Sequence, residues 1–575
     1  MLLLRMFNTY ISVIKQPTYV AVRTMSNSTV SIKFRWGLTP SDPEQQPVLI
    51  VGQAGHLNTL NWDDVRCKLE PRVSEEAWRR GLQCITSSPG DSCELWPRAA
   101  SLASLPARRS RHAAPARGHA LAKLVRATQR STDETIVLVC RKRDALASAV
   151  SIARSFPQYH ARSAAAPLSS APAPRARTVA VEIHLLSGAR TAKSTLIHNL
   201  TAARSKSLNL STGESEDEGI GALEPALCDN ALSAEELSTL QDAADATRLA
   251  ARITDTPANI MDVDKFIEEA FLVAKELDIP EPTVIRGEEL RVRGLGGIYG
   301  VGRAAARPPA LVVLSHCPPG ATDSVAWVGK GIVYDTGGLS IKARASMVGM
   351  KGDCGGAAAV LAAFAVAVKA KPTFKLHAVL CLAENAVGPL ATRPDDIHQL
   401  YSGRTVEINN TDAEGRLVLS DGVVYASRDL KAETIVDVAT LTGAQGTATG
   451  KYHAAILSNS SRLESLCIRA GLRSGDLAHA LPFAPELHFT EFTSAVADMK
   501  NSVADRNNAQ PSCAGLFILS HLGFDFPGGW LHVDMASPAH CGERATGYGV
   551  ALLSVLFGAH THSRLLKALA PAPAI

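Results

Sequence analysis

A short polar turn at residues 410–416 constrains the fold of this chain more than any other segment. Its sequence is Asn-Thr-Asp-Ala-Glu-Gly-Arg, and it separates an extended run, 405–408, from a helix-like run, 417–424. A strand that passes through a short turn into a helix is typical of open α/β sheets, which place their sites at such junctions. We therefore expect an α/β fold that presents two carboxylates, Asp412 and Glu414, at the edge of a sheet.

An upstream region repeats this arrangement and adds further charged side chains. Residues 325–334 have the pattern of a buried strand, and the glycine turn 336–338 ends it. Asp353 stands just before an Ala-rich helical run, 357–368. The charged residues at these strand ends and helix starts are four carboxylates, two lysines and one arginine: Asp335, Asp353, Asp412, Glu414, Lys330, Lys342 and Arg416.

Four carboxylates gathered at one edge would repel one another unless a cation lies between them. Oxygen-rich ligation with few imidazoles suits hard or borderline divalent ions such as Mn²⁺, Mg²⁺ or Zn²⁺. Carboxylates can also bridge two such ions about 3.5–4 Å apart. A single Asp-x-Glu pair is usually solvated or caps a helix, so the prediction of a two-metal site rests on all seven residues occurring together.

The segment 410–417 resembles the signature of the leucyl aminopeptidase family of dinuclear-metal exopeptidases. The spacings back to the upstream lysines and aspartates fit that family, as does the segment 439–444, and the resemblance covers roughly residues 249–557. Segments 68–73 and 91–93 look most like the animal "probable aminopeptidase-like" branch. The resemblance implies a metal-dependent aminopeptidase, a hydrolase that releases N-terminal amino acids from peptides by a two-metal mechanism.

The resemblance also implies a role for each metal ligand. Asp335 and Glu414 would bridge the two ions, which in this family are Zn²⁺ or Mn²⁺. Asp412 would complete the more exchangeable site, and Asp353 with the neutral amine of Lys330 would complete the tighter one. An ammonium has no lone pair, and two adjacent dications would depress the pKa of that lysine.

Two further residues are implied to act on the substrate. Lys342 would remain cationic and stabilise the oxygen of the scissile carbonyl. Arg416 would hold a bicarbonate-like anion that serves as general base. The substrate cleft would be walled by Met350, Asn410, Ala413, Thr440, Leu441 and Gly443.

Two rival functions remain open at the level of sequence. The first is a catalytically weak homologue that acts as a scaffold; Ala539 stands where family enzymes often carry a bulky methionine, whereas the intact charged set argues against this alternative. The second is a nucleic-acid-binding regulator, because no acid occurs between Glu94 and Asp133. Between Arg98 and Arg130 the stretch has no Phe, Tyr or Trp for base stacking, so we expect a solvated or subunit-facing surface and no nucleic-acid partner. Its basic residues are Arg98, Arg108, Arg109, Arg111, Arg117, Lys123, Arg126 and Arg130.

Length and composition predict four parts in this chain of 575 residues. These are an extra N-terminus, a smaller N-terminal α/β domain, an acidic insertion, and a C-terminal α/β catalytic domain with a central mixed sheet flanked by helices. Their predicted bounds are 1–25, 26–204, 205–232 and 233–575.

Location and assembly are further expectations. The 11 cysteines are scattered and odd in number, which is typical of a reducing compartment, and no run is long and apolar enough to predict a membrane span. The absence of Asp and Glu from the first 41 residues leaves a mitochondrial presequence as an alternative, but few arginines and serines favour the cytoplasm. The family resemblance implies a homohexamer.

Overall fold

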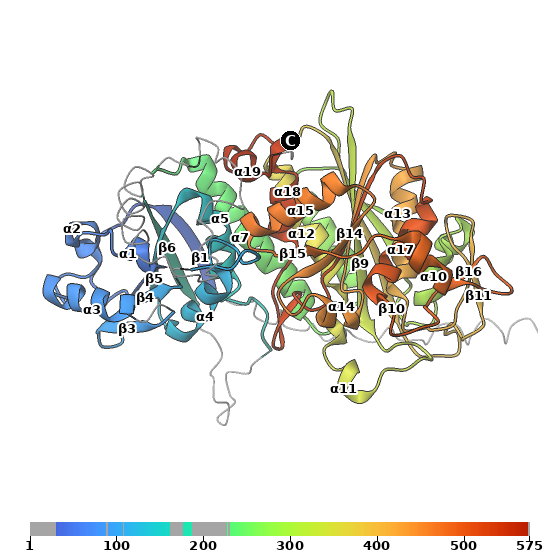
Figure 1. The fold of residues 1–575 in the computed structure, drawn as a ribbon, viewed down its shortest axis with the longest axis horizontal. Coiled ribbons are helices and arrows are strands. Elements are labelled where there is room, and N and C mark those ends of the chain that lie inside the picture. Colours follow the sequence, from blue (N-terminus) through green and yellow to red (C-terminus); the bar gives the residue numbers. More distant parts are fainter. Residues whose placement is uncertain are drawn as a thin grey trace, which may run out of the picture.

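The computed structural model of the chain describes residues 30–87, 90–106, 108–161, 176–186, 227 and 230–572. The predicted extra N-terminus at 1–25 lies outside these residues, as does most of the predicted acidic insertion at 205–232. Two sheets with their covering helices lie side by side, and helix α7 (Ala234–Asp255) runs between them (Figure 1).

The N-terminal sheet has six strands in the order β1-β6-β5-β2-β4-β3, parallel except for β3. Every residue of β2, β4 and β5 is buried, as expected of strands that are covered on both faces. The connections include helices α3 (Glu75–Ser87), α4 (Gly118–Thr128) and α5 (Ala145–Ala153). The strands are β1 (Val30–Trp36), β2 (Val48–Gln53), β3 (Ser92–Trp96), β4 (Ala100–Leu105), β5 (Glu134–Cys140) and β6 (Arg177–Leu185).

The C-terminal sheet has eight strands in the order β15-β14-β17-β13-β9-β10-β8-β7. The four central strands β17, β13, β9 and β10 are parallel, whereas β14, β8 and β7 join by antiparallel pairs, so the predicted mixed sheet is confirmed. The strands are β7 (Thr283–Arg286), β8 (Ala310–His316), β9 (Ser324–Asp335), β10 (Lys375–Asn385), β13 (Thr434–Ala439), β14 (Ala454–Ser458), β15 (Ala478–Ala480) and β17 (Gly529–Asp534).

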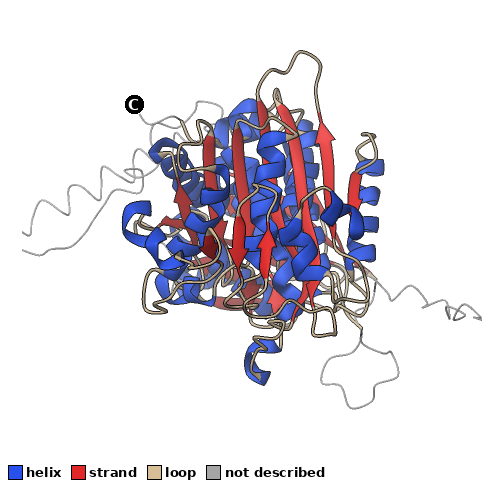
Figure 2. Cartoon of the chain, turned by 90° about the vertical axis from the view of Figure 1, so that its right-hand side faces the viewer, coloured by secondary structure: helices blue, strands red, loops and turns tan. Residues whose placement is uncertain are grey.

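Helices cover both faces of this sheet (Figure 2). Helices α12 (Gly355–Lys369) and α18 (Val550–Leu556) pack on one face together with α7, and α10 (Gly296–Gly302), α13 (Gly415–Arg428) and α17 (Gln510–Leu522) pack on the other. The expectation that no run is long and apolar enough for a membrane span was wrong by length and composition, because Met350–Lys369 meets that test, but 89% of its most apolar stretch is buried inside the protein.

Candidate active site

The parallel strands β9, β10 and β13 all end at the same edge of the C-terminal sheet. β9 ends at Asp335, β10 ends at Asn385, and Thr440 follows the last residue of β13. Loops at the carboxyl ends of parallel strands are where open α/β sheets hold their ligands. The topology therefore gathers segments that are distant in sequence around Asp335.

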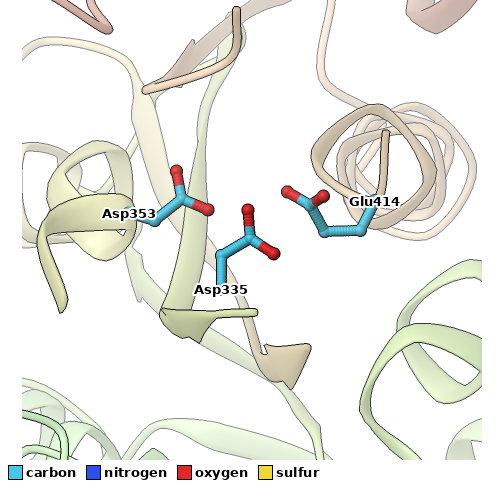
Figure 3. Close-up of side chains that lie close together, drawn as sticks. All are labelled: Asp335, Asp353 and Glu414. Carbon is cyan, nitrogen blue, oxygen red and sulfur yellow. The ribbon is translucent and has the colours of Figure 1, made fainter. Parts of the chain in front are cut away.

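Three buried carboxylates converge at this edge (Figure 3). Asp335 is the last residue of β9, Asp353 lies in the 3-10 helix η5 (Met350–Cys354), and Glu414 is the residue before α13. Each offers an oxygen atom that lies within 4.8 Å of the other two. Burial raises the pKa of Asp353 and of Glu414, and neighbouring carboxylates raise them further, so this cluster requires positive charge.

Lys330 supplies one such charge from the middle of β9. Its Nζ atom lies 2.8 Å from a carboxylate oxygen of Asp353 and 2.8 Å from one of Glu414, and it donates to the carbonyl of Thr440 over 3.1 Å. Burial acts to lower the pKa of Lys330, but the adjacent carboxylates outweigh burial and raise it.

Lys342 supplies the second charge from the loop after β9. Its Nζ atom lies 2.8 Å from Asp335 and 2.5 Å from Asp412, which brings the fourth predicted carboxylate into the cluster. Asp412 is more exposed than Asp335, with 33% of its side chain accessible against 3%. Four carboxylates and two lysines therefore lie together, as predicted, but Lys330 comes from the middle of β9 and not from a strand end.

Arg416 lies in the first turn of α13 and is 9% exposed. Its guanidinium donates to the carbonyl of Asn501 over 2.9 Å, and its Cζ atom lies 6.0 Å from the centre of the Phe492 ring. Its Nε atom is buried, and no acceptor among the described residues contacts it. Burial lowers the pKa of Arg416 to about 10, so it remains a cation at neutral pH with a donor available for an anion.

The donor set fits a divalent metal. Carboxylate oxygens dominate it, no imidazole belongs to the cluster, and the Oε2 atom of Glu414 is buried without a hydrogen bond from any described residue. A buried acceptor of this kind is costly unless a cation or donor contacts it.

Comparison with known proteins agrees with this geometry. The family described as "Cytosol aminopeptidase family, catalytic domain" matches residues 248–554, and "M17 aminopeptidase N-terminal domain 2" matches residues 46–165. This chain belongs to the cytosol aminopeptidase family. It is an aminopeptidase, a hydrolase, of the leucyl aminopeptidase type.

Relatives match this chain along most of its length. The "Probable aminopeptidase NPEPL1" of Mus musculus is 53% identical over 95% of both chains, and that of Homo sapiens is 53% identical over 95% of this chain and 96% of its own. The predicted animal branch is therefore confirmed. The solved leucine aminopeptidase of Caenorhabditis elegans is 36% identical, with a TM-score of 0.80, and the alignment covers 93% of this chain and all of that one.

Two asparagines complete the site of this cytosol aminopeptidase, and sequence reasoning missed both. Asn385 donates to Asp335 over 2.8 Å and to the carbonyl of Thr411 over 3.1 Å. Asn501 donates to the backbone carbonyls of Asn410 and Ala413, in the turn 410–416. Asparagine has no chemical signature of its own; only the position of Asn385 at a strand end could have pointed to it.

The six residues predicted to wall the substrate cleft lie on the segments that carry the charged cluster. Met350 shares η5 with Asp353, and Asn410 and Ala413 flank Asp412. Leu441 and Gly443 follow β13, and a Cβ atom at Gly443 would meet nothing within 4 Å. Thr440 also contacts the charged cluster directly, because its hydroxyl donates to Asp353 over 2.8 Å.

The arginine-rich stretch of the N-terminal domain is partly engaged inside the protein. Arg117 donates to the carbonyl of Pro106 over 3.0 Å. Arg130 lies 3.5 Å from Glu94 and donates to Ser101 over 3.4 Å. These contacts do not favour a nucleic-acid surface.

Proposed function

We propose that this aminopeptidase removes N-terminal amino acids from peptides with two divalent metal ions, Zn²⁺ or Mn²⁺. The observation that carries the proposal is the convergence of Asp335, Asp353 and Glu414 within 4.8 Å in a buried site. Asp412 and Lys330 extend this set to the five ligands that the family resemblance implies. Lys330 must lose its proton to act as a ligand, so ion binding there would release a proton.

The chain's own groups then have separate tasks. When bound, the ions would polarise the scissile carbonyl and lower the pKa of a water molecule. Lys342 would stabilise the negative charge that develops on the carbonyl oxygen, because its ammonium lies beside Asp335 and Asp412, two of the implied metal ligands. Arg416 would hold a bicarbonate-like anion through its buried guanidinium, and that anion would accept a proton from the attacking water.

Assembly and location belong to the same proposal. We infer a homohexamer from the family resemblance, which light scattering of the purified protein would test. The description of the family as cytosolic supports a cytoplasmic location, which imaging of the tagged chain would test.

The test of the proposed activity uses paired peptides that differ only at the N-terminus. A peptide with a free α-amine should lose one residue at a time in the presence of Mn²⁺ or Zn²⁺, and its N-acetylated twin should remain intact. A chelator should stop the reaction. Equal cleavage of both peptides, or no cleavage of either by protein with two ions bound, would contradict the proposal.

A further inference from the structure

Asn501 lies immediately after strand β16 (Met499–Lys500), beside the polar turn 410–416. β16 pairs in parallel with β12 (Thr405–Glu407), the strand that leads into this turn. The side chain of Asn501 is completely buried. A buried amide must satisfy its donors and acceptors within the protein, and the partners of Asn501 therefore indicate what it holds.

The side-chain amide of Asn501 makes hydrogen bonds to the backbone on both sides of Asp412. Its Oδ1 atom accepts from the backbone N–H groups of Asn409 and Asn410, over 2.9 and 3.2 Å. Its Nδ2 atom donates to the carbonyls of Asn410 and Ala413, over 2.6 and 3.3 Å. The four bonds bracket Asp412 and end at the residue before Glu414.

The backbone of Asn501 holds the other functional group of this segment. Its carbonyl accepts the hydrogen bond from Arg416 over 2.9 Å, and its own N–H donates to the carbonyl of Glu407 over 3.1 Å. One residue thus connects the strand before the turn, the turn itself and the arginine after it.

Thr411, near the start of the turn, makes a second set of contacts. Thr411 donates its backbone N–H to Ser340 over 3.1 Å and its hydroxyl to the carbonyl of Gly337 over 2.6 Å, and its carbonyl accepts from Asn385. These bonds tie the turn to the loop that follows Asp335. Asn501 contacts the turn from the opposite side, immediately after β16, and its carbonyl also accepts from Arg416, so it helps to set the distance of Asp412 and Arg416 from that loop.

We propose that Asn501 is a positioning residue for the proposed two-metal reaction: it holds the turn that carries Asp412 and Glu414, and the guanidinium of Arg416, in one fixed relation. This inference rests on the proposed function. Displacement of a reacting group by about 1 Å can lower a rate a hundredfold. Loss of the Asn501 side chain should therefore lower kcat and weaken the binding of one metal ion, while KM changes little.

The test compares Asn501→Ala with Asn409→Ala in the full chain. Asn409 is an exposed asparagine next to the same strand pair, and its side-chain amide bonds to the backbone of Ser502, over 2.9 and 3.1 Å. We expect Asn501→Ala to lose about tenfold to a hundredfold in kcat with KM within about threefold of the original. Titration of metal-stripped protein with Mn²⁺ should show one weakened site, and Asn409→Ala should match the unchanged protein in both measurements.

Several results would overturn this inference. Asn501→Ala with unchanged kcat and metal affinity would do so, and so would an equal loss in Asn409→Ala, because the effect would then belong to the strand pair. If Asn501→Ala fails to fold, Asn501→Asp decides: it keeps the shape and Oδ1 but loses both Nδ2 donors. Asn501→Asp with unchanged kcat and metal affinity contradicts the inference; a selective loss supports it. An unchanged protein that binds Mn²⁺ but cleaves no peptide refutes the proposed function alone, and the metal titration still tests Asn501.

Discussion

At the scale of single residues, the two lysines of the site are alike in charge but differ in surroundings. Lys330 is enclosed by Asp353 and Glu414, with 3% of its side chain exposed, whereas Lys342 has 14% exposed and bridges Asp335 and Asp412. A fully enclosed amine suits a metal ligand, and a partly open ammonium suits contact with a substrate. Burial acts to lower the pKa of Lys342, but its carboxylate partners outweigh burial and raise it, so it stays charged at neutral pH.

Replacing Lys342 by Ala should therefore reduce turnover more than metal content. Removing one donor that stabilises a developing oxyanion typically costs a factor of about 10²–10³ in kcat. Steady-state kinetics and metal analysis of the purified variant would measure both quantities. Lys567→Ala, at an exposed position on helix α19 (Arg564–Leu569), is the matched control. Loss of bound metal in proportion to activity would contradict the assigned role.

At the scale of elements, the start of α13 brings the site together and leaves no space for a side chain at Gly415. A Cβ atom there would lie 2.8 Å from the Nζ atom of Lys330 and 2.8 Å from Leu441. The glycine of the turn motif is thus explained by the close approach of α13 to β9. The loop after β9 also requires a glycine. Gly337 has a φ of 82°, and a Cβ atom there would lie 2.8 Å from Asp412.

The variant Gly415→Ala should keep the fold but displace Lys330, and should weaken metal binding by at least about tenfold. The physical reason is the short contact with Lys330, whose Nζ atom lies 2.8 Å from each of its two carboxylate partners and would have to shift. Metal titration and circular dichroism would separate the two effects. Gly55→Ala is the control, since a Cβ atom at Gly55 meets nothing within 4 Å. Unchanged metal affinity in Gly415→Ala would show that the contact does not matter.

Elements were also the level at which the sequence was most informative. The predicted strand at 325–334 is β9, and the predicted helix at 357–368 is α12. Both could be predicted because a long buried element has a continuous run of apolar residues. The charged residues could be foreseen because strand ends concentrate them. Asn501 could not, because its contact with Asn410 spans 91 positions and depends on how β16 pairs with β12.

At the scale of the whole molecule, the two sheets share one apolar core through α7. Buried side chains of the N-terminal sheet, α5, α7 and α12 form a continuous cluster. A buried ion pair reinforces this junction: Lys142 Nζ lies 2.7 Å from Glu236 on α7, with 4% and 6% of the side chains exposed. The N-terminal domain is therefore packed as part of the enzyme.

Lys142→Ala should destabilise the protein by about 3 kcal/mol, because it leaves a carboxylate buried without its partner charge. Lys265→Ala, which breaks the exposed pair with Glu268, should cost less than about 1 kcal/mol. Denaturant unfolding would compare the two variants. Equal stabilities would contradict the importance of the junction.

The most direct test of the account is a metal titration of the stripped protein, followed by hydrolysis of a peptide with a free N-terminus. We predict that activity is absent in chelator, rises with added Mn²⁺ or Zn²⁺, and reaches its maximum at two ions per chain. Glu414→Gln, which alters a carboxylate of the buried cluster, should bind fewer ions and show no turnover. Full activity in the metal-stripped protein, or in Glu414→Gln, would contradict the two-metal site.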